Sequence, residues 1–182
     1  MKTIRKILNL VPLFTAYFIL VFIFWAWIFT FLTDAPRENK ILLYIDAAVP
    51  GEKEISLMLE DENDPEIRFV KVKPFTYSMM DSSGIRAADL YIVRESNIME
   101  YKDWFAPLPE ALHFTGEAYE IDGAAHGIPV YDFLSASGIC VGAIEYEAEN
   151  YYLFIGKESV HMDDTDSGGR TVTYAKRLLG WE

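Results

Sequence analysis

Cysteine is nearly absent from this chain: its 182 residues include a single one, Cys140. An internal disulfide and a thiolate metal cluster are therefore excluded. Cys140 stands within a Gly-Ile-Cys-Val-Gly stretch, which favours a small buried apolar side chain over a reactive nucleophile. The three histidines, His113, His126 and His161, are far apart in the sequence, and none has a metal-ligand spacing with Cys140. We expect neither a metal nor another cofactor.

Other signatures of catalysis are also missing. The sequence has no glycine-rich phosphate loop, and Ser135 and Ser137 lack the pattern of a nucleophile elbow. Glu117, Glu120 and Asp122 could be paired carboxylates, but acidic side chains on a hairpin are usually solvated. The sequence therefore favours a protein that is not an enzyme, and an enzyme with an undetected site is kept as an alternative.

Basic residues are scarce and unevenly distributed. The chain has 16 Lys and Arg against 28 Asp and Glu, a formal net charge of −12. Lys2, Arg5 and Lys6 precede the first long apolar stretch, and every acidic residue follows it. Residues 34–182 thus carry 28 acidic side chains against 13 basic ones, a formal charge of about −15. Such a charge disfavours nucleic acid and anionic lipid as partners.

What the sequence does have is a long apolar stretch, Leu8 to Leu32, without a charged side chain. A helix of roughly 25 residues reaches about 37 Å, enough to cross a hydrocarbon core of about 30 Å with some tilt. Trp25 and Trp27 lie near its far end, where amphipathic rings favour the headgroup region. We expect residues 8–32 to cross the lipid bilayer. The alternatives are a cleaved export signal and a buried helix of a soluble core.

The flanking charges predict an orientation. The three basic residues before the stretch place the N-terminus in the cytoplasm by the positive-inside rule. A signal peptide has a shorter apolar core of about 7–15 residues, and Thr33 and Pro36 make a poor cleavage site after Ala35. We therefore predict an uncleaved signal-anchor of a single-pass cell-membrane protein. Residues 1–33 would form the cytoplasmic N-terminus and the transmembrane helix, residues 34–39 a linker, and residues 40–182 an extracytoplasmic domain. The linker would also be outside the cytoplasm, so all of residues 34–182 would be extracytoplasmic.

The first half of the domain alternates between two kinds of segment. Lys40–Asp46, Ile67–Lys73 and Asp89–Val93 have the apolar pattern of buried strands. A helix is expected after each strand, within residues 52–63, 77–88 and 97–104, with Asn97 capping the last one. This alternation predicts an α/β fold, a single Rossmann-like lobe with a mainly parallel sheet.

The second half has a different pattern. Tyr119 to Tyr131 is typical of a hairpin that turns at Asp122-Gly123. Ile139–Tyr146 and Tyr151–Ile155 are expected to be further strands, and Thr171–Leu179 a closing helix.

Four segments carry motifs that also occur together in one protein family. They are Asp89-Leu-Tyr-Ile-Val with the following helix, Trp104-Phe-Ala-Pro-Leu-Pro, Tyr119 to Tyr131, and Tyr151 to Ser159. In this order they resemble the first lobe of bacterial extracellular solute-binding proteins of ABC importers. The resemblance implies a periplasmic-binding-protein-like fold and a role in transport.

The resemblance also has a gap. About ten residues, Phe133 to Val141, stand where such proteins carry a whole second lobe. Those proteins grip a solute between two lobes by hinge closure. The resemblance therefore implies a truncated, membrane-anchored form whose single lobe offers an open surface.

In open α/β sheets, ligands collect beyond the carboxyl ends of the strands. Polar and aromatic side chains at those ends would supply hydrogen bonds and a ring face to a small solute. The alternative is that they only cap helices and turns. The candidate ligand-binding residues are Asp46, Arg94, Glu95, Ser96, Tyr131 and Asp132.

Two kinds of function remain open besides an enzyme. The first is a binding or interaction domain that contacts a small solute or a membrane transporter or sensor. The second is a structural or regulatory membrane subunit that keeps the fold without binding a solute.

Overall fold

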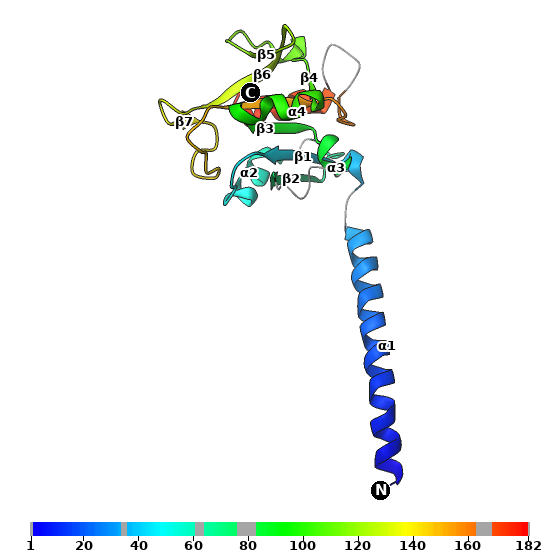
Figure 1. Ribbon diagram of the computed structural model, residues 1–182. Coiled ribbons are helices and arrows are strands. Elements are labelled where there is room, and N and C mark those ends of the chain that lie inside the picture. The colour runs from blue at the N-terminus through cyan, green and yellow to red at the C-terminus, as the bar shows by residue number, and fades with distance from the viewer. Residues whose placement is uncertain (1, 34–35, 61–63, 76–82, 163–168, 182) are drawn as a thin grey trace. The chain divides into compact units, whose positions relative to one another are not determined.

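The computed structural model describes residues 2–33, 36–60, 64–75, 83–162 and 169–181. In the first helix, side chains are described for residue 12 and residues 14–29 only. The chain divides into two compact units, Met1–Pro36 and Arg37–Glu182, and each is described by itself (Figure 1).

The first unit is a single helix, α1 (Lys2–Thr33), of 32 residues. Along its described part, large apolar side chains such as Phe14, Leu20, Phe22 and Trp25 are more than half exposed. Within the described residues, no helix combines the length and the hydropathy that a membrane crossing requires.

The second unit is an α/β domain built on one mixed sheet with the strand order β2-β1-β3-β8-β6-β5. Three neighbouring strands are parallel: β2 (Phe69–Pro74), β1 (Lys40–Ile45) and β3 (Leu90–Arg94). The others are antiparallel to their neighbours: β8 (Tyr151–Gly156), β6 (Ala124–Asp132), β5 (Tyr119–Ile121), and the short β4 (Phe105–Ala106) and β7 (Ser137–Gly138).

The expected α/β class is confirmed, and the sheet is mixed: it is parallel at its core, in β2, β1 and β3, and antiparallel beyond them. β2, β1 and β3 run in one direction, and the helices α2 and α3 lie between these strands in the chain. After β4 the chain forms the β5–β6 hairpin instead, and β8 then enters between β3 and β6 in the opposite direction. Antiparallel neighbours need no crossover helix, and among the described residues none joins β6 to β8.

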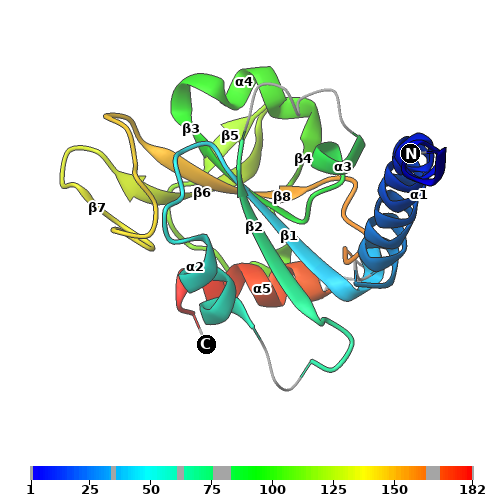
Figure 2. The ribbon, with the colours of Figure 1, turned by 90° about the horizontal axis from the view of Figure 1, so that it is seen from below.

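Helices cover both faces of the sheet (Figure 2). One face is covered by α2 (Glu52–Leu59) and α5 (Gly169–Leu179), the other by α3 (Ser83–Arg86) and α4 (Ile98–Tyr101). In the part of the chain that the structure describes, four 3-10 turns connect these elements: η1 (Arg37–Asn39), η3 (Glu95–Asn97), η4 (Lys102–Trp104) and η5 (Glu110–Leu112).

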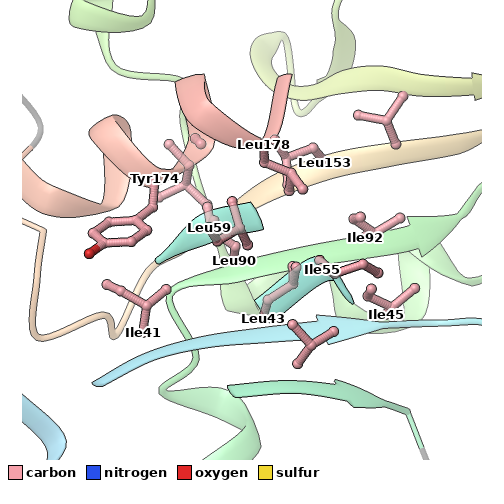
Figure 3. Close-up of a cluster of buried hydrophobic side chains, with 14 of the residues drawn as sticks. Ile41, Leu43, Ile45, Ile55, Leu59, Leu90, Ile92, Leu153, Tyr174 and Leu178 are labelled. Carbon is pink, nitrogen blue, oxygen red and sulfur yellow. The ribbon is translucent and has the colours of Figure 1, made fainter. Parts of the chain in front are cut away.

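Alternation along β1 and its neighbours builds two cores, because successive side chains of a strand point to opposite faces. On the α2/α5 face, Leu43 packs with Leu59 and Leu178 (Figure 3). On the α3/α4 face, Tyr44 and Tyr91 belong to an aromatic cluster. Burying an aliphatic or aromatic side chain of this size stabilises the fold by about 1.5–3 kcal/mol each.

Two local expectations were wrong. Residues 139–146 form turns with isolated bridges at Val141, Ile144 and Glu145, not a strand. The backbone is left-handed at Cys140 (φ 50°) and Gly142 (φ 98°), which is incompatible with an extended chain.

The helix expected within 97–104 is the short α4, which lies between two 3-10 turns, and the Asn97 side chain does not cap it. The expected helix within 77–88 is described only from residue 83, since residues 76–82 lie outside the described part.

Candidate functional site

The carboxyl ends of β1 and β3 place Asp46 and Arg94 side by side, because the two strands are parallel and in register. The Arg94 guanidinium donates to Asp46 Oδ2 from Nε at 3.0 Å and to Oδ1 from Nη2 at 3.2 Å. Nη2 also donates to the main-chain oxygen of Asp46 at 3.1 Å. Such a two-pronged contact is the geometry that an arginine fork favours with a carboxylate.

Two further residues join this pair. Asn97 donates from Nδ2 to Asp46 Oδ2 at 2.8 Å, which explains why its side chain does not cap α4. Arg94 donates from Nη1 to the Glu147 carboxylate. Burial of the Arg94 side chain opposes its charge, but the hydrogen bond and the charge of Asp46 outweigh that effect and raise the pKa of Arg94.

The segment that includes residues 143–150 lies along the same edge. Its main chain bonds to the loop after β1, with Glu145 N donating to Ala48 O at 2.9 Å. The Ser96 amide donates to Glu149 Oε2 at 3.1 Å. Hydrogen bonding from the Ser96 side chain first, and then from this amide, lowers the pKa of Glu149. The Asn150 amide donates from Nδ2 to Glu95 Oε2 at 3.0 Å. Glu95 and Ser96 therefore bind this segment of the chain.

Tyr131 and Asp132 lie at the far end of β6 and have local roles. The Tyr131 ring stacks on Tyr146 with 4.1 Å between ring centroids. Asp132 accepts hydrogen bonds from Ser135 Oγ at 2.8 Å and from the Leu134 amide at 2.9 Å. These bonds, the one from Ser135 first, lower the pKa of Asp132 and close the turn before β7.

A depression of about 510 Å³ opens at the carboxyl ends of β1, β2 and β3. Of the six predicted ligand residues, only Asp46 and Arg94 line it. The other lining residues come from the loop after β1, the end of β2 and the 143–150 segment: Ala47, Ala48, Val49, Pro50, Pro74, Phe75, Glu145 and Glu147.

Phe75 and Glu147 were missed by sequence reasoning for different reasons. Phe75 directly follows the last residue of β2, so the rule that singled out Asp46 and Arg94 also applied to it. Glu147 belongs to a turn-rich segment with no periodic pattern, and nothing in the sequence indicates that it meets Arg94.

Among the residues that the structure describes, no group of three or more His, Cys, Asp or Glu side chains could hold a metal ion. Cys140 is partly buried, and burial raises the pKa of its thiol. Less thiolate is present at neutral pH as a result, which disfavours nucleophilic attack by this cysteine.

No protein family, curated protein or solved structure is found to match this chain. The resemblance to solute-binding proteins therefore stays a prediction from the sequence segments.

Proposed function

We propose that this chain is a single-pass membrane protein whose extracytoplasmic domain binds a small solute, or a transporter or sensor in the same membrane. The observation that carries the proposal is the depression at the carboxyl ends of β1, β2 and β3. Ligand sites of open α/β sheets lie at this edge. A single-lobe relative of solute-binding proteins would present its ligand surface there.

The proposed anchor is supported by the apolar stretch and its flanks. Residues 8–32 carry no charged side chain, and α1 continues through all of them as one helix. A lone helix with bulky apolar side chains exposed on its described part has no soluble core of its own. Lipid is the solvent that such side chains favour.

The lining of the depression suggests the chemistry of its ligand. Glu147 is 57% exposed at the side chain and accepts a hydrogen bond from Arg94, and Glu145 also lines the depression. Phe75 adds an aromatic ring and Pro50 an apolar wall. A ligand with hydrogen-bond donors or a positive charge and one apolar face fits this set best.

The test is a thermal-shift screen of the full chain in detergent against sugars, amino acids, short peptides and divalent cations at millimolar concentration. A ligand that binds only the native state raises the melting temperature by mass action. We expect Glu147→Gln to reduce a shift found in this way. Glu117→Gln is the matched control, because Glu117 is exposed and does not line the depression.

One observation favours the second candidate function, a structural or regulatory subunit. The Asp46 carboxylate already accepts hydrogen bonds from Arg94 and Asn97, so a ligand must compete with the protein's own groups. If no compound in the screen shifts the melting temperature, solute binding is wrong and this second function is favoured. Neither function includes a catalytic step.

A further inference from the structure

A second polar network lies at the opposite, amino-terminal end of β3, where Asp89 is fully buried. Its Oδ2 accepts a hydrogen bond from the Leu42 amide at 2.7 Å. Its Oδ1 accepts one from Ser159 Oγ and faces His161 Nδ1 at 3.0 Å. Hydrogen-bonding groups thus approach both oxygens of Asp89.

His161 is enclosed by acceptors at both ring nitrogens. Nδ1 faces the Asp89 carboxylate, and Nε2 lies 3.1 Å from the main-chain oxygen of Glu38. A neutral imidazole has only one N–H, so one of these two contacts would bring two lone pairs together. Both contacts are hydrogen bonds only when the ring is an imidazolium. The side chain is 3% exposed, so water cannot readily replace either partner.

The surrounding groups fix the ring in this position. The His161 amide donates to Ser159 Oγ at 3.1 Å, and the Ser159 and Thr171 hydroxyls are 3.0 Å apart at the start of α5. Arg170 is the cation whose charge opposes an imidazolium here, and Arg170 itself is held by Asp64 and Glu66. Asp89 is the charged partner that favours the imidazolium.

We propose that His161 is a proton-dependent clamp that fastens η1, the first turn of the domain, to the buried Asp89. When the ring is protonated, it bridges the Glu38 carbonyl and the Asp89 carboxylate. When it loses a proton, one bridge is lost and η1 and the loop after β8 become less firmly held. This inference concerns the opposite edge of β3 from the depression, so it stands whatever the depression binds.

The direction of the pH dependence follows from the same contacts. Burial opposes the charged ring, but the hydrogen bond and charge of Asp89, with the Glu38 carbonyl, outweigh burial and raise the pKa of His161 above 6.5. A raised pKa means that the folded state holds the proton more tightly than the unfolded chain. The stabilisation is complete below pH 6.5 and is lost as the pH rises through the pKa of the folded state.

The direct test is nitrogen-detected NMR of the histidine rings in the full chain in detergent micelles. At pH 6.5, the value of the free side chain, we expect both nitrogens of His161 to carry protons in most molecules. On raising the pH, one proton should be lost, and exchange of the Leu42 and His161 amides with solvent should become faster. A ring with a single N–H at this pH, or exchange independent of the titration, would overturn the proposal.

Variants provide a second test by thermal unfolding. In the native sequence the melting temperature should fall as the pH rises above 6.5 and through the pKa of His161 in the folded state. His161→Gln should lower the melting temperature at the acidic end and remove this fall, whereas His126→Gln is the matched control and should keep it. His126 is also buried, but its Nδ1 lies 2.8 Å from the main-chain oxygen of Ala124 rather than from a carboxylate. Equal slopes in all three proteins would contradict the clamp. If His161→Gln does not fold, the NMR measurement on the native protein decides.

Discussion

At the scale of the residue, the two aspartates Asp46 and Asp89 show how position along a parallel strand decides a role. Asp89 precedes β3 and is fully buried, so its hydrogen bonds serve the fold. Asp46 follows β1 and lines the depression, where its carboxylate positions Arg94. Among the described residues, Arg94 and Asn97 are the side chains that donate to the Asp46 carboxylate. Removing Arg94 would leave this largely buried group with Asn97 alone, which is costly.

Gly156 gives a prediction at the same scale. A Cβ at this position would overlap the carbonyl oxygen of Ala88 and would crowd the Tyr91 ring at 3.2 Å. Because the obstacle is main chain, we expect Gly156→Ala to lower the free energy of unfolding by about 1–3 kcal/mol. Urea unfolding followed by circular dichroism measures the change.

Gly84→Ala is the control for this substitution. Gly84 lies in α3, and nothing is within 4 Å of a Cβ placed there. Alanine in an exposed helix should be neutral or stabilising by up to about 1 kcal/mol. If the two substitutions had equal effects, the close approach of Gly156 to Ala88 would not be a real constraint.

At the scale of the element, the β5–β6 hairpin was fully predictable and segment 139–146 was not. Asp122 and Gly123 both have positive φ, 51° and 83°, as the Asp-Gly signal predicts for a two-residue turn. Cys140 and Gly142 also have positive φ, but they stand in an apolar stretch whose composition favours a strand. The apolar composition of such a segment predicts that its side chains are buried. It does not predict whether a strand or a series of turns buries them.

The strand directions mark the same limit. Local patterns located β1, β3 and β8 within about one residue at each end. The antiparallel placement of β8 between β3 and β6 depends on pairings of residues far apart in the chain, such as Tyr91 with Phe154. The sequence indicated Asp46 and Arg94 as site residues because both follow local strand patterns. The contact of Arg94 with Glu147 could not be predicted, because it joins residues that are far apart in the chain.

The hairpin turn supports a second stability prediction. Gly123 has open space around a Cβ, so the cost of a side chain there is conformational only. We expect Gly123→Ala to destabilise the domain by about 1 kcal/mol, because a left-handed backbone disfavours alanine. Gly123→Asn should cost less, since asparagine tolerates this conformation. An alanine variant as stable as the native protein, in urea unfolding, would show that the turn geometry differs.

At the scale of the whole molecule, the chain joins two units of opposite polarity. The first is an uncharged apolar helix over residues 8–32, and the second is a strongly acidic α/β domain. The proposed topology, with the N-terminus in the cytoplasm and the domain outside, depends on the basic residues that precede the helix. Both proposed functions require this topology. A domain inside the cytoplasm could not bind a solute or a partner on the outer side of the membrane.

The most direct measurement is therefore the location of the C-terminus in intact bacterial cells. In one strain, a phosphatase reporter that is active only outside the cytoplasm is fused after Glu182. In a parallel strain, a fluorescent reporter that matures only in the cytoplasm is fused at the same place. We expect an active phosphatase and a dark fluorescent fusion, with both chains in the membrane fraction after an alkaline wash. A fluorescent fusion with inactive phosphatase, or a chain released by the wash, would contradict the membrane-anchored extracytoplasmic domain.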